Sequence, residues 1–349
     1  MMMENNPVKL RGIEFIEFSA KDPKSMHDLF QAFGFSRIMR HDQKKIDLYQ
    51  QGQITFLLNS EPTSFATDFY EQHGPCVSSM GWKVEDTTYA LEKAVERGAN
   101  AAERIDYQYD GNDLQGIVGI GNSNIYFIDK YNEKDFYEKL GFKKLEKPDM
   151  VEDLGFDFID HLTNNVEQGQ LKVWSDFYKN IFGFTEVRYF DIRGVKTGLQ
   201  SFALKSPDGS FCIPINEGTE SKSQINEYLE EYKGPGVQHI ALHTNDIIKS
   251  ISRLSSTQVE TLDIDDEYYQ EVFNRVPNVS EDHKKLQELQ ILVDGDEEGY
   301  LLQIFTKNII GPIFFEIIQR KNHLSFGEGN FGALFRSIER DQEKRGYLK

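Results

Sequence analysis

The chain repeats itself, and this repetition constrains its fold more than any local propensity does. The strand-like phrase Gly-Ile-Glu-Phe-Ile-Glu-Phe at residues 12–18 returns as Gly-Phe-Asp-Phe-Ile-Asp-His at 155–161. An amphipathic helix follows each copy, and the helices end alike, in Leu-Phe-Gln-Ala-Phe-Gly-Phe and Phe-Tyr-Lys-Asn-Ile-Phe-Gly-Phe. A further pair is Gly-Pro-Cys-Val-Ser-Ser at 74–79 and Gly-Pro-Gly-Val-Gln-His at 234–239. The sequence therefore predicts two equivalent halves.

Each half divides again into two β-α-β-β-type units. Apolar and polar residues alternate along 10–20, as they do in a half-buried strand, and a helix is expected to begin at Asp22-Pro23. Further strands and a second helix are expected at 46–50, 54–58, 74–84, 86–97 and within 117–128. The order then repeats after a polar, proline-containing stretch at 146–153. We expect the domain boundary there, with domains at residues 1–150 and 151–349.

The charge of the chain excludes some classes of partner. Its 39 Lys and Arg residues against 57 Asp and Glu residues give a net charge of −18, which would repel nucleic acid and anionic membranes. No run of about 18 apolar residues occurs, and residues 1–9 contain no apolar region of a signal peptide. Cys76 and Cys212 lie far apart, without the spacing of a thiolate metal site. We expect a cytoplasmic protein that binds neither nucleic acid nor membrane.

Two histidines stand out against the repeat. His239 lies in a short apolar strand, where a lone histidine is more often a core residue than a ligand. In the first half, Ser79 occupies the position of His239, and Phe18 aligns with His161. A packing requirement for imidazole would apply to both halves, so we interpret both histidines as functional.

A third candidate ligand is Glu316, a carboxylate inside the apolar stretch 314–318. Burying a carboxylate is costly unless it is paired or bound to a metal. One alternative is therefore an ion pair in the core with Arg320 or another cation. The other is a metal site, because two imidazoles and one carboxylate form the facial triad typical of non-haem Fe(II) oxygenases. Such a triad leaves three metal positions open for substrate and O₂.

Several longer phrases resemble one family, collinearly from about residue 10 to the C-terminus. They are Pro-Ile-Asn-Glu (214–217), Ser-Gln-Ile-Asn-Glu-Tyr (223–228), Gly-Val-Gln-His-Ile-Ala-Leu (236–242), Gly-Tyr-Leu-Leu-Gln-Ile-Phe-Thr-Lys (299–307), Phe-Glu-Ile-Ile-Gln-Arg (315–320) and Phe-Gly-Glu-Gly-Asn-Phe-Gly-Ala-Leu-Phe (326–335). In these phrases the chain resembles the 4-hydroxyphenylpyruvate dioxygenases of the vicinal-oxygen-chelate superfamily. The resemblance implies an α+β fold of four βαβββ modules paired into two domains. Each domain would be an open, barrel-like mixed sheet with outer helices, and a C-terminal helix would follow.

The resemblance also implies an activity and a site. The enzyme would convert 4-hydroxyphenylpyruvate and O₂ to homogentisate and CO₂ in tyrosine catabolism, without 2-oxoglutarate because the substrate is itself the keto acid. One Fe(II) per chain would be held by His161, His239 and Glu316. Polar residues near the substrate would be Ser201, Asn216, Gln224, Gln238 and Gln303. Residues that bind the substrate would be Pro214, Phe305, Phe314, Phe326, Asn330 and Phe331. The first half would be a non-catalytic domain, and the chain would form a homodimer or homotetramer.

Two rival functions share this framework. A 4-hydroxymandelate synthase acts on the same substrate but hydroxylates the benzylic carbon; its pocket phrase differs from the Pro-Ile-Asn found here at 214–216, which favours ring hydroxylation. The second rival is a non-catalytic member of the superfamily that only binds a small molecule. Retention of all three candidate ligands argues against that class.

The C-terminal segment predicts a helix of its own. Phe331, Leu334, Phe335 and Ile338 recur with helical spacing, and Asn330 would be the N-cap. We interpret this helix as a lid that excludes water from the site.

A last prediction concerns the strand around His239. Neighbouring side chains on an ideal strand point to opposite faces. If Gln238 faces the substrate, as the resemblance implies, the strand must be twisted or bulged at that point.

Overall fold

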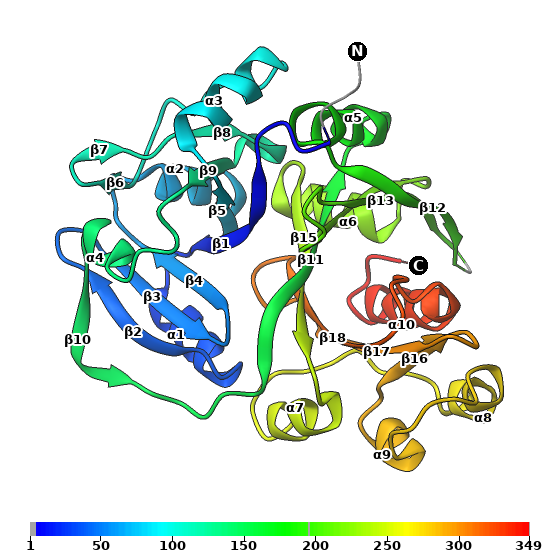
Figure 1. Ribbon diagram of the computed structural model, residues 1–349. Coiled ribbons are helices and arrows are strands. Elements are labelled where there is room, and N and C mark those ends of the chain that lie inside the picture. Colours follow the sequence, from blue (N-terminus) through cyan, green and yellow to red (C-terminus); the bar gives the residue numbers. More distant parts are fainter. Residues whose placement is uncertain (1–4, 195, 349) are drawn as a thin grey trace.

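Two eight-stranded mixed sheets, one from each half of the chain, lie side by side with helices on their outer faces (Figure 1). This computed structural model describes residues 5–194 and 196–348. The long strands of the two halves run next to each other, and the C-terminal helix lies over the second sheet (Figure 1). The architecture confirms the expected α+β fold of paired modules.

The N-terminal half contains two modules. Its elements are β1 (Leu10–Ser19), α1 (Pro23–Ala32), β2 (Ser36–His41), β3 (Ile46–Gln51), β4 (Ile54–Asn59), α2 (Phe65–His73), β5 (Cys76–Val84), α3 (Thr87–Glu96), β6 (Gln108–Tyr109), β7 (Asn112–Asp113), β8 (Gly116–Val118), the 3₁₀ helix η1 (Ile120–Asn122), β9 (Asn124–Ile128), α4 (Phe136–Lys139) and β10 (Phe142–Asp149). The strand order in the sheet is β10-β2-β3-β4-β1-β5-β9-β8, and β6 pairs with β7 as a separate hairpin.

The C-terminal half repeats the scheme with longer connections. Its elements are β11 (Phe156–Val166), α5 (Leu171–Phe182), β12 (Thr185–Arg193), β13 (Gly198–Lys205), β14 (Cys212–Gly218), α6 (Gln224–Tyr232), β15 (Gly236–Thr244), α7 (Ile247–Leu254), α8 (Asp266–Arg275), α9 (His283–Glu288), β16 (Leu292–Gly295), β17 (Tyr300–Phe305), β18 (Phe314–Lys321), the 3₁₀ helix η2 (Glu328–Asn330) and α10 (Phe331–Lys344). The strand order is β12-β13-β14-β11-β15-β18-β17-β16. The proposed domain division after residue 150 falls between β10 and β11.

The two sheets share one plan. In each, an antiparallel pair of long strands stands at the centre, β1 with β5 and β11 with β15. Each of these strands has a parallel neighbour on its other side, which makes the sheets mixed. The halves differ at both edges: β10 adds a strand beside β2 in the first sheet, and β16 adds one beside β17 in the second.

The cross-strand register corrects one sequence alignment. Glu17 pairs with Ser79 in the first half, as Thr163 pairs with His239 in the second, so Ser79 is the counterpart of His239. Counted from these pairs, the counterpart of His161 is Phe15, and the alignment with Phe18 is wrong. The glycines of the two phrases misled it, since one lies inside β1 and the other precedes β11. A phenylalanine stands opposite the histidine in either alignment, so the argument for function survives.

Local chemistry explains where the helices start and stop. The side chain of Asp22 accepts a hydrogen bond from the Lys24 backbone nitrogen, and Pro23 occupies the first turn of α1. At the other end of the equivalent helix, Gly183 closes α5 in a left-handed conformation with φ +80°. A Cβ there would lie 2.6 Å from the Asn5 carbonyl oxygen, so the position requires glycine.

Aromatic side chains join the two halves into one core. Phe315 of β18 packs edge-on against Phe33, with ring centroids 4.9 Å apart, and lies 6.0 Å from Phe56. At a second contact, Trp82 lies 4.8 Å from Phe182. Among the helices in the described ranges, none is both long and apolar enough to cross a membrane.

Loss of the Phe315 ring should destabilise the protein strongly. The ring is fully buried between the halves. Phe315→Ala should therefore lower the free energy of unfolding by about 3–5 kcal/mol, measured by urea denaturation. The control is Leu324→Ala, whose side chain is 76% exposed and whose loss should cost at most about 0.5 kcal/mol. Similar urea midpoints for the two variants would contradict the view that this aromatic contact holds the halves together.

Candidate metal centre and its pocket

Three ionisable side chains converge in the second sheet. The Nε2 atom of His161 lies 3.1 Å from Oε2 of Glu316 and 3.3 Å from Nε2 of His239. Nε2 of His239 lies 3.4 Å from the same Glu316 oxygen. All three residues are buried, and they are the only group of possible metal ligands of this kind among the described residues. The structure thus brings together the three ligands that the sequence predicted.

The strand register explains this convergence. His161 on β11 pairs with Ala241 on β15, which in turn pairs with Glu316 on β18. Residues paired across strands project from the same face of a sheet, and Ala241 leaves space between its two neighbours. His239 precedes Ala241 by two positions and so projects from that face as well.

A bulge in β15 adds Gln238 to the same face. Asn164 pairs with Val237 and Thr163 pairs with His239, so Gln238 is an extra residue with no partner across the ladder. Both Gln238 and His239 border the cavity described below. The predicted irregularity is therefore confirmed.

Each histidine is held in the orientation that a metal ligand needs. Nδ1 of His161 donates a hydrogen bond to Oδ1 of Asp160 at 2.7 Å, and Nδ1 of His239 donates to Oε1 of Gln238 at 3.0 Å. Both Nε2 atoms are thereby directed at Glu316. Such partners on the far nitrogen are usual for metal-ligating histidines. Sequence reasoning missed Asp160, although an acidic residue next to a candidate histidine was the available signal.

Thr163 is a second missed residue. Its hydroxyl donates a hydrogen bond to Nε2 of His239 at 3.0 Å, on the side where a metal would bind. It is one of the residues that border the cavity. No motif in the sequence marked it, because its place follows from the strand register.

The electrostatics suit a cation. Burial raises the pKa of Glu316, but the adjacent His161 and His239 outweigh it and leave the pKa below its usual value. Burial lowers the pKa of His161, yet Glu316 and Asp160 raise it to about 9. Burial dominates at His239 and lowers its pKa, which favours the neutral imidazole. The carboxylates of Glu316 and Asp160 thus stabilise a positive charge beside the point where the ligand atoms meet.

The donor set also fits an octahedral divalent metal. Bonds of about 2.1 Å at right angles place neighbouring ligand atoms about 3.0 Å apart. The three observed separations, 3.1, 3.3 and 3.4 Å, are close to that value. Two imidazoles and one carboxylate on one face match the facial triad.

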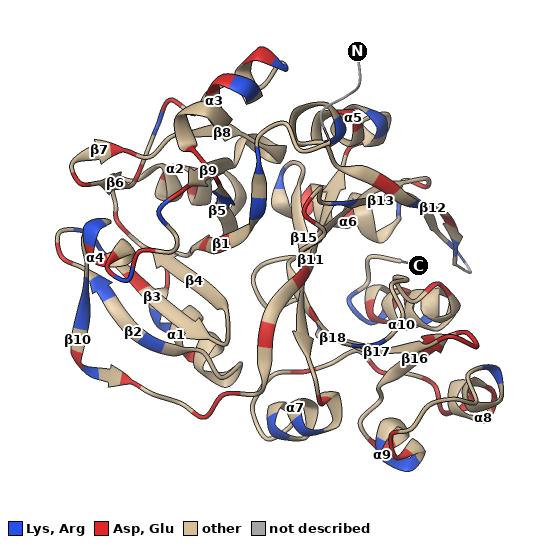
Figure 2. Cartoon of the chain, viewed as in Figure 1, with Lys and Arg blue, Asp and Glu red and all other residues tan. Residues whose placement is uncertain are grey.

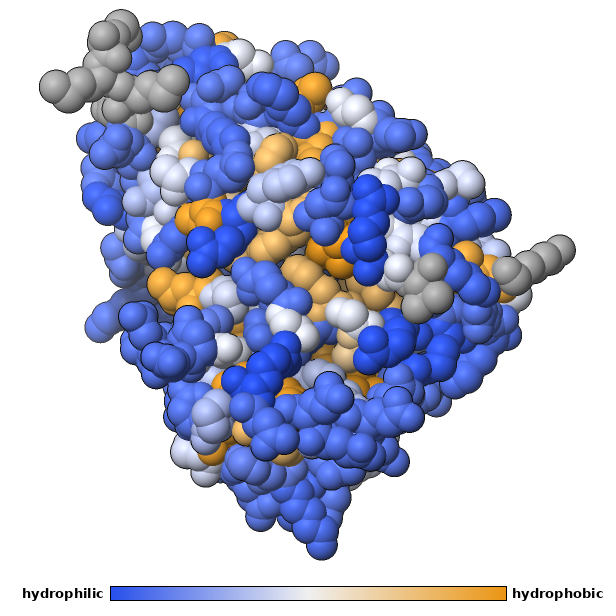
Figure 3. Space-filling view, turned by 90° about the vertical axis from the view of Figure 1, so that its right-hand side faces the viewer, coloured by the Kyte–Doolittle hydropathy of each residue, from blue (hydrophilic) through white to orange (hydrophobic). Residues whose placement is uncertain are grey.

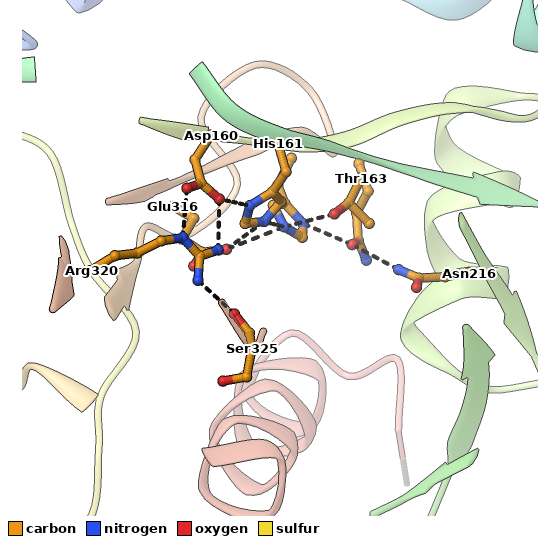
Figure 4. A network of polar contacts seen from close by, with 9 residues as sticks. Asp160, His161, Thr163, Asn216, Glu316, Arg320 and Ser325 are labelled. Carbon is orange, nitrogen blue, oxygen red and sulfur yellow. Dashed lines mark hydrogen bonds and ion pairs between the residues drawn. The ribbon is translucent and has the colours of Figure 1, made fainter. Parts of the chain in front are cut away.

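Glu316 does not form the core ion pair with Arg320 that was weighed as the alternative to a metal site. Arg320, weighed as its partner, hydrogen-bonds to Asp160 with its Nε and Nη2 atoms at 2.7 and 2.8 Å. Figure 4 shows Arg320 reaching Asp160 rather than the centre of the site. Figure 2 shows acidic positions on β11, the strand that carries Asp160 and His161. In the described structure, the ionisable side chains within 4 Å of the Glu316 carboxylate are those of the two histidines.

The metal ligands form one wall of a cavity that opens to solvent. Figure 3 shows apolar residues within an opening framed by hydrophilic ones. The predicted site residues that border the cavity are Ser201, Pro214, Asn216, Gln224, Gln238, Phe305, Phe314, Phe326 and Phe331. Further bordering residues that were not predicted as site residues are Thr163, Phe190, Ile192, Leu199, Leu334, Phe335 and Ile338. The last three belong to the apolar face of α10, so its helical spacing was a usable signal.

Two predicted residues lie outside the cavity wall. Gln303 is buried, and neither its Oε1 nor its Nε2 has a hydrogen-bond partner. A Cβ at Gly327 would lie 2.3 Å from that Nε2. Asn330 precedes α10 but is no side-chain N-cap, contrary to expectation. Its Oδ1 instead accepts hydrogen bonds from the Tyr268 hydroxyl at 2.6 Å and from Arg275 at 3.2 Å, which holds the amide away from the helix.

The corresponding place in the first half is filled. Phe15 stands where the second half has His161, and Tyr126 stands where it has Glu316. Glu17 occupies the position of Thr163 and is fully buried. Its carboxylate accepts hydrogen bonds from Asn59, Ser78, Ser79 and Tyr107 at 2.5–3.0 Å. This half holds a saturated polar cluster in place of a metal centre.

Comparison with known proteins decides the family. A family model described as "Hydroxyphenylpyruvate dioxygenase, HPPD, N-terminal" matches residues 4–143, and the glyoxalase/bleomycin resistance protein/dioxygenase superfamily matches residues 158–273. The 4-hydroxyphenylpyruvate dioxygenase of Legionella pneumophila is 44% identical over 100% of this chain and 99% of its own length. The chain belongs to the 4-hydroxyphenylpyruvate dioxygenase family. The family enzyme of Pseudomonas aeruginosa is 42% identical over 99% of this chain and 98% of its own, and Protein MelA of Shewanella colwelliana is 54% identical over both full lengths.

Solved structures support the same fold. A mutant of 4-hydroxymandelate synthase from Streptomyces coelicolor superposes with a TM-score of 0.83, at 22% identity over 96% of this chain and 99% of that chain. A fusion of a xylose isomerase-like TIM barrel with a 4-hydroxyphenylpyruvate dioxygenase gives a TM-score of 0.81 at 26% identity, over 96% of this chain and 54% of that chain. The family fold thus extends over nearly the whole chain.

Removal of one ligand should abolish tight metal binding. We expect Glu316→Ala and His239→Ala to lower the affinity for a divalent metal by more than the roughly 10–100-fold that removal of an outer partner costs, because each residue supplies one of three donors. Elemental analysis of the metal per chain, with circular dichroism as a check of folding, measures the effect.

A matched control is Asp106→Asn, which removes the charge of another buried carboxylate, in the first half. It should retain one metal per folded chain. Equal metal loss in the control would place the metal outside the predicted centre.

Proposed function

We propose that this protein is an Fe(II)-dependent dioxygenase that converts 4-hydroxyphenylpyruvate and O₂ to homogentisate and CO₂ in tyrosine catabolism. The observation that carries the proposal is the convergence of His161, His239 and Glu316 at one wall of an aromatic cavity. Full-length membership of the 4-hydroxyphenylpyruvate dioxygenase family supports the choice of substrate.

Fe(II) is the metal that we assign to the triad. When bound, it supplies the redox chemistry that activates O₂ and leaves positions for the keto acid. The chain holds both Nε2 atoms toward it through Asp160 and Gln238. Because the keto acid is part of the substrate, no 2-oxoglutarate site is required.

The charge of the cavity wall fits an anionic substrate chelated to a metal. Apart from the two histidines and Glu316, every residue that borders the cavity is neutral, and none is Arg or Lys. An anion buried in such a wall needs a positive partner. A divalent metal with one glutamate carries a net charge of +1, so one substrate anion brings the centre to about zero. The wall therefore needs no cationic side chain.

Neutral amides can hold the phenol end or the keto acid without removing a proton irreversibly. Nδ2 of Asn216 lies 3.3 Å from Oε1 of Gln238, which also accepts the hydrogen bond from His239. These contacts join the proposed substrate contacts to a metal ligand. We assign Ser201 and Gln224, which border the same cavity, to the same set.

The remaining wall excludes water and fits a flat ring. Phe314 stacks on the His239 imidazole with ring centroids 4.8 Å apart, and Phe305 approaches it edge-on at 6.2 Å. Helix α10 closes the other side with Phe331, Leu334 and Ile338. A dry cavity protects reactive intermediates from side reactions. The lid function of α10 stays a prediction.

The decisive experiment is reconstitution without oxygen. The protein is loaded with Fe(II) under anaerobic conditions, mixed with 4-hydroxyphenylpyruvate and exposed to O₂, and both O₂ uptake and products are measured. We expect stoichiometric O₂ consumption, CO₂ and homogentisate. 4-Hydroxymandelate as product would identify the sister activity instead. Metal binding without substrate-dependent O₂ uptake would identify a non-catalytic binder.

Loss of the Asn216 amide should weaken catalysis without loss of metal. Asn216→Leu replaces the amide by an apolar group of similar size, so we expect kcat/KM to fall about 10–100-fold, or about 1.4–2.7 kcal/mol. Steady-state O₂ uptake provides the measurement. Asn278→Leu is the matched control, since its amide bonds to the Asp296 carbonyl on the surface. A control that lost as much activity as Asn216→Leu would exclude a specific role for Asn216.

The oligomer is a separate part of the proposal. We expect a homodimer or homotetramer, as the family resemblance implies. Sedimentation velocity of the purified chain distinguishes these assemblies from a monomer.

A further inference from the structure

A buried arginine that does not itself border the cavity binds two groups that hold the cavity wall in place. Arg320 lies on β18, four residues after Glu316, and its side chain is 13% exposed. Its Nε and Nη2 atoms bind the two oxygens of Asp160 at 2.7 and 2.8 Å. This is the bidentate geometry that only a guanidinium provides.

On one side, the pair leads to a metal ligand. Oδ1 of Asp160 accepts a hydrogen bond from Nδ1 of His161 at 2.7 Å as well as one from Arg320. Asp160 is itself almost fully buried. Without Arg320, its carboxylate would be a buried charge with only the imidazole as partner. Arg320 thus fixes the carboxylate that orients His161.

On the other side, the same guanidinium holds the segment before α10. Nη1 of Arg320 donates to the carbonyl oxygen of Ser325 at 2.7 Å (Figure 4) and to that of His323 at 3.1 Å. The next residue, Phe326, borders the cavity. Its ring lies edge-on to the His161 imidazole at 5.6 Å, and the guanidinium carbon lies 5.9 Å from its centroid. The contacts therefore form a closed circuit: His161 contacts Asp160, Asp160 binds Arg320, Arg320 lies beside Phe326, and Phe326 packs against His161.

We propose that Asp160 and Arg320 are positioning residues that couple the orientation of the metal ligand His161 to the placement of Phe326 in the cavity wall. The proposal rests on the metal centre of the proposed function but not on the identity of the substrate. It differs from an ordinary structural ion pair in one respect. A change at Asp160 must alter the segment 322–330, although the described structure shows no hydrogen bond or ion pair between the two. A change at Arg320 must in turn alter the metal site.

The hydrogen-bonding geometry of Arg320 explains how the pair can couple His161 to the segment before α10. Four hydrogen bonds leave the guanidinium in three directions, to Asp160 and to two backbone carbonyls. A lysine carries a single ammonium and cannot serve these acceptors in the same fork. Arg320→Lys therefore keeps the charge and removes the coupling. Asp160→Asn keeps the shape and removes the charge that anchors Arg320.

The test uses two readouts on the whole chain. The first is the dissociation constant of Co(II), a probe for the metal site, titrated into apo-protein and followed by visible absorption without substrate or O₂. The second is hydrogen–deuterium exchange of the peptide that covers residues 322–330. We expect each variant to weaken Co(II) binding about 10–100-fold and to speed exchange of this peptide at least about tenfold.

Arg37→Lys is the matched control. Arg37 is also a half-buried arginine bound to two aspartates, Asp47 and Asp149, but it lies in the first half. It should change neither readout. If Asp160→Asn proves unable to fold, Arg320→Lys alone tests the coupling, because it should both weaken Co(II) binding and speed exchange of the 322–330 peptide.

Two outcomes overturn the coupling. In one, a folded variant weakens Co(II) binding while the 322–330 peptide exchanges as in the wild type; in the other, the peptide loosens while Co(II) affinity is unchanged. A wild-type chain that binds no Co(II) overturns the coupling together with the metal centre. If the wild type binds Co(II) but makes no homogentisate with Fe(II), only the proposed function fails, and the two readouts still judge the coupling.

Discussion

The structure depends on the burial of a carboxylate between two imidazoles. An isolated carboxylate in this position would cost several kcal/mol, and its neighbours must offset that cost. The neighbours come from β11 and β15, the strands beside the β18 that carries Glu316, so the sheet must hold its register for the site to exist. The fold and the metal centre are therefore one constraint: a slip of one residue would turn His161 to the opposite face.

Around this centre, hydrogen-bond partners hold the metal ligands in fixed orientations. Asp160 and Gln238 each fix a histidine ring, and each is held in turn, the first by Arg320 and the second by Asn216. The cavity wall beyond them is neutral and largely aromatic. No Arg or Lys side chain borders the cavity, and the ligand atoms are set before a metal or substrate arrives.

The sequence could predict features that follow from repeats and motifs. It could not predict contacts that depend on how the strands pair. The repeat predicted the modules, and the missing imidazoles of the first half identified His161 and His239. Asp160 and Thr163 were missed because their roles arise from pairing across strands. The same reason explains the Phe18 alignment, since bulges and strand starts shift the count without changing the motif. Asn330 stands at the predicted N-cap position of α10, but its side chain does not cap the helix because Tyr268, 62 residues away in the chain, binds its amide oxygen.

The filled cluster around Glu17 has an evolutionary consequence. A second metal centre in the first half would need three new ligands in place of Phe15, Ser79 and Tyr126. It would also require the loss of Glu17 or of its donors, because the carboxylate already binds Ser79, the counterpart of His239. Each single step would leave a buried group without its partner. The first half is thus separated from a metal centre of its own by a stability barrier.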